Sequence, residues 1–173
     1  MNEIVRIPEE RINILIGKDG RTRKTIEKRC SVKLKISEEG VEIRGDPENV
    51  FFATDVVKAI GRGFEPRKAL KLLRDEYALY VIPLRELVST DKAMTRVKGR
   101  VIGENGTVKT RIEEATDSFL SIYGSTISII SKIDTMEYAK EAISMLIEGA
   151  RHSSVLAYLS KSRREIMDSR LRS

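Results

Sequence analysis

The stretch Ile16-Gly17-Lys18-Asp19-Gly20-Arg21-Thr22-Arg23-Lys24 is the first of two copies of one pattern. The second copy, Ile102-Gly103-Glu104-Asn105-Gly106-Thr107-Val108-Lys109-Thr110, begins 86 positions later. The same offset carries Val41 onto Ile127. Because an internal repeat this long is the size of a domain, the sequence predicts two domains of one fold.

The amino-acid composition limits the classes of protein to which the chain can belong. The chain has 173 residues, of which 40% are hydrophobic and 34% charged, with no Trp, so we expect aliphatic cores under an ionic surface. No apolar run approaches the ~18–20 residues that span a bilayer, and residues 1–5 show no basic segment followed by an apolar one. We therefore expect a cytoplasmic protein that neither enters a membrane nor is secreted.

The inventory of reactive side chains is small. A single Cys30 excludes an internal disulfide, and with the single His152 it leaves no zinc cluster and few catalytic triads. We expect no metal, no cofactor and no enzymatic activity. Cys30 falls where a helix should end, and we interpret it as a buried, inert thiol.

Charge is concentrated in two segments. The formal net charge is +6, and residues 17–36 hold eight Lys and Arg against two acids. Residues 151–173 hold six against two. This distribution indicates a polyanionic partner, and nucleic acid is favoured over a membrane because neither segment has a bulky aromatic face.

Apolar periodicity gives the element order of the first copy. We expect a strand at 4–7 ended by Pro8, helices at 9–16 and 21–30, a hairpin of strands at 32–36 and 41–43, and a helix from Asp46-Pro47 to Gly61. The predicted order is strand, helix, glycine loop, helix, strand, strand, helix.

The second copy repeats this order with one insertion. We expect a strand at 77–83, a helix at 107–115, strands at 118–123 and 126–130, and a closing helix at 135–148. Eleven extra positions around 84–93 are expected to add a helical turn or loop of unknown role. The predicted organisation is a first domain at 1–63, a linker helix at 64–76, a second domain at 77–150 and a basic extension at 151–173 with one or two helices.

The Gly-x-x-Gly turn has a physical use between two helices. Glycines permit a tight backbone, hold no side chain against a sugar-phosphate chain, and expose amides at a helix N-terminus, where the dipole favours phosphate. A single such tetrapeptide is weak evidence, but two copies in the same element order are strong evidence. The pattern is neither a P-loop nor a dinucleotide fingerprint.

This element order around the glycine loop resembles the type I KH domain, a module that holds about four single-stranded nucleotides. More closely, the chain resembles the partner-of-Nob (Dim/Pno) family of KH-domain factors in small ribosomal subunit assembly, in its archaeal branch. The residues that carry this likeness are Arg62-Gly63-Phe64, 79–82 (Leu-Tyr-Val-Ile), 98–103 (Lys-Gly-Arg-Val-Ile-Gly), 112–116 (Ile-Glu-Glu-Ala-Thr) and Ser153-Ser154-Val155. The fold class so implied is α+β, with two tandem type I KH domains of order β-α-α-β-β-α and a C-terminal basic helical extension.

The resemblance implies a protein that binds single-stranded RNA, namely precursor or mature small-subunit rRNA near its 3′ end. It implies cooperation with the Nob-type endonuclease that trims that end, and with other ribosome-assembly or translation proteins. The RNA-binding residues expected in the first domain are Ile16, Gly17, Lys18, Asp19, Gly20, Arg21, Arg23, Lys24, Lys33 and Lys35. Those expected in the second are Lys98, Arg100, Val101, Ile102, Gly103, Glu104, Asn105, Gly106, Thr107 and Lys109.

The sequence leaves open which domain binds RNA. Charge favours the first, because residues 103–122 carry two cations against four acids. Family resemblance favours the second, where Arg96, Lys98 and Arg100 precede the loop and are interpreted as replacing the missing cations. Two alternatives stay open: one domain serves mainly to dock a protein, or the chain is another KH factor such as an RNA-degradation cofactor. A nuclease is disfavoured because the sequence shows no metal cluster and no nucleophile-base pair.

Overall fold

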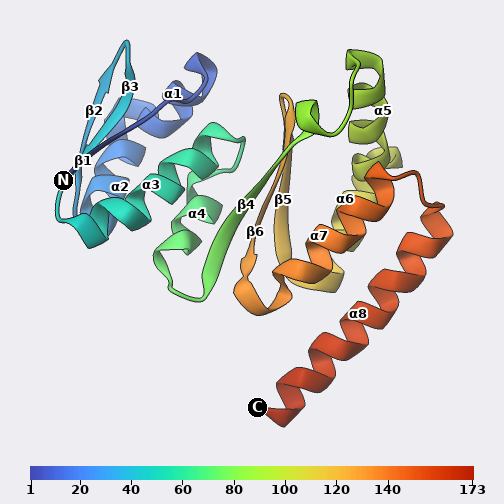
Figure 1. Ribbon diagram of the computed structural model, residues 1–173. Coiled ribbons are helices and arrows are strands. Elements are labelled where there is room, and N and C mark those ends of the chain that lie inside the picture. Colours follow the sequence, from blue (N-terminus) through green and yellow to red (C-terminus); the bar gives the residue numbers. More distant parts are fainter. The chain divides into compact units, whose positions relative to one another are not determined.

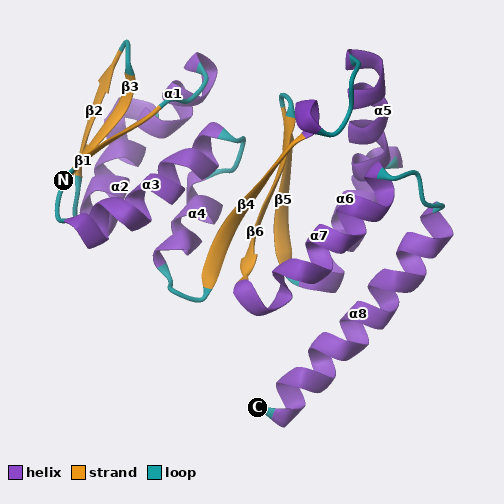
Figure 2. Ribbon diagram, viewed as in Figure 1, coloured by secondary structure: helices purple, strands orange, loops and turns teal.

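The computed structural model describes residues 1–173 and divides them into two compact units, Met1–Leu79 and Tyr80–Ser173. Each unit contains a three-stranded sheet and the helices that cover it (Figure 1). Figure 2 shows the same alternation of strands and helices in both units.

The first unit has the predicted element order. Its elements are β1 (Asn2–Val5), α1 (Glu9–Ile16), the 3₁₀ turn η1 (Lys18–Gly20), α2 (Arg21–Cys30), β2 (Lys33–Ser37), β3 (Gly40–Arg44) and α3 (Pro47–Gly61). Both strand pairs are antiparallel in the order β1-β3-β2, which leaves β2 at an edge. Leu34 and Ile43 face each other on the side that the helices cover, and both are buried.

The first strand lies two residues earlier than the predicted span 4–7. Asn2–Val5 pair with Arg44–Val41 of β3, whereas Arg6 and Ile7 lie outside the sheet. Ile7 packs against α3 instead, at a position where a Cβ on Gly61 would lie 2.3 Å from its Cγ2 atom. The strand prediction missed this because an apolar residue before Pro8 has the same pattern whether it pairs in a sheet or packs on a helix.

Residues 64–76, expected to link the domains, hold two short helical segments. These are α4 (Pro66–Ala69) and the 3₁₀ turn η2 (Leu70–Leu73), which both contact α3. Ala69, Leu70 and Leu72 are buried. This segment therefore forms part of the first unit's core.

The second sheet and its helices repeat the first set. The elements are β4 (Tyr77–Pro83), η3 (Leu84–Glu86), α5 (Asp91–Ile102), η4 (Glu104–Gly106), α6 (Thr107–Thr116), β5 (Ser118–Tyr123), β6 (Thr126–Lys132) and α7 (Ile133–Ile147). The sheet order β4-β6-β5 matches that of the first sheet.

The extra residues before the second loop form the 3₁₀ turn η3, which is the additional helical turn expected there, and they also lengthen the helix that follows. The side chain of Thr90 accepts a hydrogen bond of 3.0 Å from the Ala93 amide and caps α5. α5 has 12 residues where α1 has 8.

The C-terminal extension is one helix, α8 (His152–Arg172), which packs along α6 and α7 (Figure 1). Val155, Leu159 and Ile166 are buried on its inner face. None of the helices has the length and apolar character that crossing a membrane requires.

Equivalent positions build both cores. Ile26 and Ile112, which are 86 positions apart, are fully buried. The Glu27 carboxylate accepts a 2.9 Å hydrogen bond from the Leu34 amide, and the Glu113 carboxylate accepts one of the same length from the Leu120 amide. Glu113 is therefore a structural residue, because it ties α6 to the edge strand as Glu27 ties α2.

Candidate nucleic-acid interface

The two glycine loops have the same backbone conformation. Gly17 has φ 72° and ψ 178°, and Gly103 has φ 74° and ψ 176°. Asp19 and Asn105 both lie at φ 55°. Each loop is a tight turn with left-handed residues that leads into the N-terminus of α2 or α6, and the repeated tetrapeptide predicted a turn between two helices.

The two glycines of each loop serve different purposes. A Cβ on Gly17 would lie 2.1 Å from the Thr22 hydroxyl, and one on Gly103 would lie 2.4 Å from a Val108 methyl, so the first glycine is required by packing. A Cβ on Gly20 or Gly106 would meet no atom within 4 Å. The second glycine faces open space at a helix N-terminus, which is where a phosphate group would approach.

The first loop is surrounded by cations. Lys18, Arg21 and Lys24 are exposed on η1 and α2, and Asp19 is exposed beside them. Arg23 is half-buried and lies 3.6 Å from the Glu27 carboxylate. Ile16, also half-buried, precedes the loop on α1. The sequence-predicted residues of this loop therefore gather at one end of α2.

Lys33 and Lys35 lie on the solvent face of the sheet. They alternate with the inward Leu34 on β2, and in the register of the sheet they stand opposite Arg44 and Glu42. Their side chains therefore leave β2 on the face that the helices do not cover.

Lys24 and Lys33 line a cavity together with two cations, Lys28 and Arg44, that the sequence analysis did not select as RNA-binding residues. This cavity, of about 520 Å³ at the C-terminal end of α2, is lined by Lys24, Lys28, Lys33 and Arg44, with Glu27 as its one carboxylate. The sequence held a signal for this site, because comparing charge position by position between the two copies would have singled out these residues.

Two cations predicted for the second site are engaged elsewhere. The Lys98 ammonium donates a 2.8 Å hydrogen bond to the Gly124 carbonyl, in the turn between β5 and β6. The Arg100 guanidinium donates to the carbonyls of Leu146, at 2.8 Å, and Ala150, where α7 ends. Arg100 thus takes the role that Arg11 has in the first unit, whose guanidinium donates to the equivalent carbonyls of Ile60 and Phe64.

The other predicted residues of the second site divide by exposure. Val101 is fully buried, as is Leu15 at the equivalent position, so its side chain belongs to the core. Ile102 is 36% exposed and stands beside the loop. Glu104, Asn105 and Thr107 are exposed on the loop and Gly106 is half-buried there, while the Thr107 hydroxyl donates a 2.8 Å hydrogen bond to the Glu104 carbonyl. Lys109, on the first turn of α6, is half-buried.

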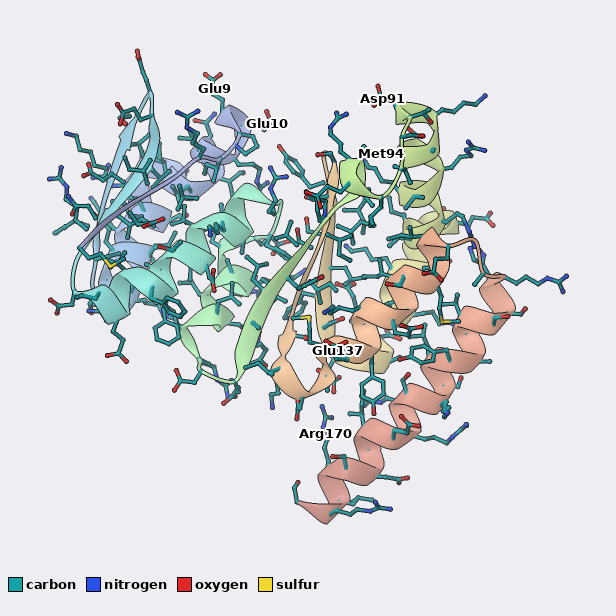
Figure 3. All side chains as sticks on the ribbon, viewed as in Figure 1. Glu9, Glu10, Asp91, Met94, Glu137 and Arg170 are labelled. Carbon is teal, nitrogen blue, oxygen red and sulfur yellow. The ribbon has the colours of Figure 1, made fainter.

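Two arginines from α8 reach the C-terminal end of α6. Arg163, at 3.1 Å, and Arg170 donate hydrogen bonds to the Asp117 carboxylate at the end of α6. Figure 3 shows Arg170 near the C-terminal end of α8. Burial raises the pKa of Asp117, but the hydrogen bond and charge of Arg170, with those of Arg163, outweigh it and leave the pKa lowered. A cavity of about 570 Å³ between the two helices is lined in part by Arg111, Arg163 and Arg164.

The only cysteine is buried at the end of α2. Burial raises the pKa of the Cys30 thiol to about 11, against which the nearby charge of Arg29 acts only weakly. The thiol is therefore protonated at neutral pH, which agrees with the prediction of an inert residue. No group of three or more His, Cys, Asp or Glu side chains that would suit a metal ion gathers within residues 1–173.

Comparison with family models identifies both halves of the chain. The model described as eukaryotic type KH-domain (KH-domain type I) matches residues 7–77 and 78–164. This description agrees with the element order and with the two glycine loops, so the predicted fold class is confirmed.

Several known proteins are similar to this one. A KH domain-containing protein of Methanocaldococcus jannaschii is 44% identical, over 97% of this chain and 77% of its own length. A solved a/eIF2alpha-aDim2p-rRNA complex from Pyrococcus horikoshii contains a chain that is 41% identical, with a TM-score of 0.88 and 95% of each chain covered. The pre-rRNA-processing protein PNO1 of Chaetomium thermophilum is 29% identical over 73% of this chain, which spans about half of that protein's length.

Proposed function

The chain belongs to the type I KH-domain family of the PNO1 and Dim2p proteins, and from that premise we propose that it is an RNA-binding adaptor in ribosomal RNA processing. In this proposal it binds single-stranded small-subunit rRNA, or its precursor, through the glycine loops. It acts in the cytoplasm by holding RNA rather than by cleaving it.

One observation carries the proposal. Both loops keep the same left-handed backbone, and both turn their second glycine, Gly20 or Gly106, toward open space. A sugar-phosphate chain would approach the backbone there without meeting a side chain, next to the amides of a helix N-terminus. The rRNA in the complex with the similar Pyrococcus protein supports ribosomal RNA as the ligand.

The test is a fluorescence titration of the full chain with single-stranded RNA from the 3′ end of small-subunit rRNA. Lys18→Asp and the double variant Glu104→Asp/Asn105→Asp each place acidic groups where a phosphate would lie. We expect at least one of them to weaken binding by about tenfold or more, because a charge-assisted contact is replaced by repulsion. Unchanged affinity in both variants would contradict the proposal.

We further propose that the RNA lies near the 3′ end of small-subunit rRNA, where a Nob-type endonuclease is the partner. An RNA of equal length from elsewhere in the same rRNA is the control for position. We expect the 3′-end RNA to bind more tightly, and we expect the endonuclease to be retained on immobilised protein together with that RNA. Equal affinity for both RNAs would limit the protein to general single-strand binding.

A second candidate function assigns RNA to one domain and protein docking to the other. It is favoured by the unequal loops: the first carries exposed Lys18, Arg21 and Lys24, while Lys98 and Arg100 of the second are bonded to carbonyls. The complex of the Pyrococcus relative also contains a/eIF2alpha, so a translation protein is a reasonable partner to test. Equal losses of RNA affinity in the two loop variants would argue against this division.

A further inference from the structure

The cavity at the C-terminal end of α2 has four cations on its wall. Lys24 and Lys28 come from successive turns of α2, Lys33 from the start of β2, and Arg44 from the end of β3. Its one carboxylate, Glu27, is already engaged, because one oxygen accepts the Leu34 amide and the other lies 3.6 Å from Arg23.

The four cations of this cavity differ in whether a carboxylate pairs with them. Glu42 fixes the Arg44 guanidinium with two hydrogen bonds, of 2.9 and 3.0 Å. Lys24, Lys28 and Lys33 are exposed, and no carboxylate lies within salt-bridge distance of their ammonium groups. Three lysines that no carboxylate neutralises therefore line one cavity, where the positive charge favours a bound anion.

The second copy of the fold shows that the fold itself does not need these cations. At the equivalent positions, 86 residues later, stand Thr110, Glu114, Phe119 and Ile130. A lysine in the last turn of a helix is often explained by the helix dipole, and Lys28 alone would fit that explanation. The helix dipole does not explain Lys24, Lys33 or Arg44, and α6 has no basic residue in its last turn.

We propose that this cavity binds a phosphate group of RNA beyond the nucleotides held at the first glycine loop. The inference rests on the proposed function, and it adds a second anchoring point to the first domain. The cavity runs along α2 from Lys24, one turn beyond the first glycine loop, to Ser31 past the end of the helix, so it begins beside the loop and continues away from it. Since a KH groove holds about four nucleotides, we expect only a strand longer than four to reach the cavity.

The test uses the full chain with Glu104→Asp/Asn105→Asp as background, so that binding reports on the first loop. One variant adds Lys28→Glu to this background and so introduces the charge that the second copy has at the equivalent position. The matched control instead adds Lys58→Glu, on the exposed side of α3. Each protein is titrated with RNAs of four and ten nucleotides at several salt concentrations, and circular dichroism checks folding.

For the ten-nucleotide RNA we expect Lys28→Glu to weaken binding about tenfold and to reduce the logarithmic salt slope by about 0.7, the value for one phosphate on a single strand. We expect the control to bind like the background, and the four-nucleotide RNA not to distinguish the variants. Equal slopes for Lys28→Glu and Lys58→Glu with the longer RNA would overturn the inference.

Two further outcomes separate this inference from the proposed function. An equal loss with the four-nucleotide RNA would place the cavity inside the ordinary groove and overturn the claim of a second anchoring point, while RNA binding itself stands. Failure of the unsubstituted chain to bind either RNA would overturn the proposed function and, with it, this inference.

Discussion

The two glycines of a loop are predicted to differ in what their substitution costs. Gly17 lies at φ 72° and ψ 178°, a region that only glycine occupies freely, and a Cβ there would strike Thr22. We expect Gly17→Ala to lower the free energy of unfolding by about 2–5 kcal/mol, from strain and crowding together.

Gly20→Ala is the matched comparison, because its Cβ meets nothing. We expect it to cost only the left-handed conformation, about 1–2 kcal/mol, while it weakens RNA binding. Urea unfolding of both variants measures the difference. Equal destabilisation by the two substitutions would contradict the division of roles between the glycines.

Arg100 is predicted to stabilise the fold. Its guanidinium donates to the carbonyls that end α7, so Arg100→Ala leaves them without that donor. We expect a loss of about 1–3 kcal/mol in the free energy of unfolding. Arg96→Ala, an exposed position on the same helix, serves as the control and should change stability little. Weakened RNA binding at full stability would instead restore Arg100 to the site predicted from the sequence.

The thiol of Cys30 provides a probe of the first core. Burial raises its pKa to about 11 in the folded chain, above the ordinary value of a free thiol, so folding favours the neutral thiol. This contribution to stability is complete below pH 9 and declines as the pH rises through 11. At pH 8 we expect iodoacetamide to label the native protein far more slowly than the urea-unfolded protein. Comparable labelling rates would show that the end of α2 opens readily.

At the scale of elements, one acidic residue adds to the apolar packing that holds α8 on α6. Asp117 accepts from Arg163 and Arg170, and its pKa is lowered in the fold. The stabilisation is therefore present above the unfolded pKa of about 3.9, and it is lost as the pH falls through the lower folded value.

We expect Asp117→Asn to lower stability at pH 7 by about 1 kcal/mol or less, as for exposed ion pairs, and to remove that part of the acid sensitivity. Hydrogen exchange of the α8 amides at pH 7 measures the effect locally. Glu148→Gln, also exposed in the second unit, is the control. The same fall of α8 protection in both variants would argue against this contribution of Asp117.

The sequence predicted most elements of the fold because their signals are local. Apolar periodicity, Pro47 at a helix start and Gly-x-x-Gly between helices depend on residues near in the chain. Because the two copies share one pattern, each predicted helix or strand could also be compared with its equivalent in the other copy. The start of β1 was wrong because Ile7 packs on Gly61, a neighbour 54 positions away in sequence that no local pattern reveals.

The candidate site was predicted less completely, because it depends on where long side chains end. The backbone of both loops follows from their glycines. Lys98 and Arg100 stand near the loop in sequence, yet their charged groups reach carbonyls of other elements. Lys28 and Arg44, 16 positions apart, share a cavity only because β3 ends beside α2. Such side-chain positions depend on the tertiary structure, which local sequence patterns do not reveal.

At the scale of the whole molecule, α8 changes the electrostatic balance of the second unit. Residues 1–79 hold 17 Lys and Arg against 14 acids, and residues 80–173 hold 15 against 12. Without residues 151–173 the second unit would hold 9 against 10. The positive charge that α2 carries in the first unit is thus supplied to the second by its terminal helix.

We therefore expect α8 to speed RNA binding by the second loop, because a positive field raises the rate of encounter with a polyanion. In the full chain with Lys18→Asp, which weakens the first loop, Arg164→Glu should slow association about twofold to fivefold at low salt. Arg164 is exposed and forms no ion pair, so the fold should tolerate the change. Arg67→Glu, exposed in the first unit, makes the same change in net charge. The measurement is the association rate by stopped flow. Slowing by Arg164→Glu alone assigns the effect to α8. Equal slowing by both substitutions would mean that only the net charge of the chain matters.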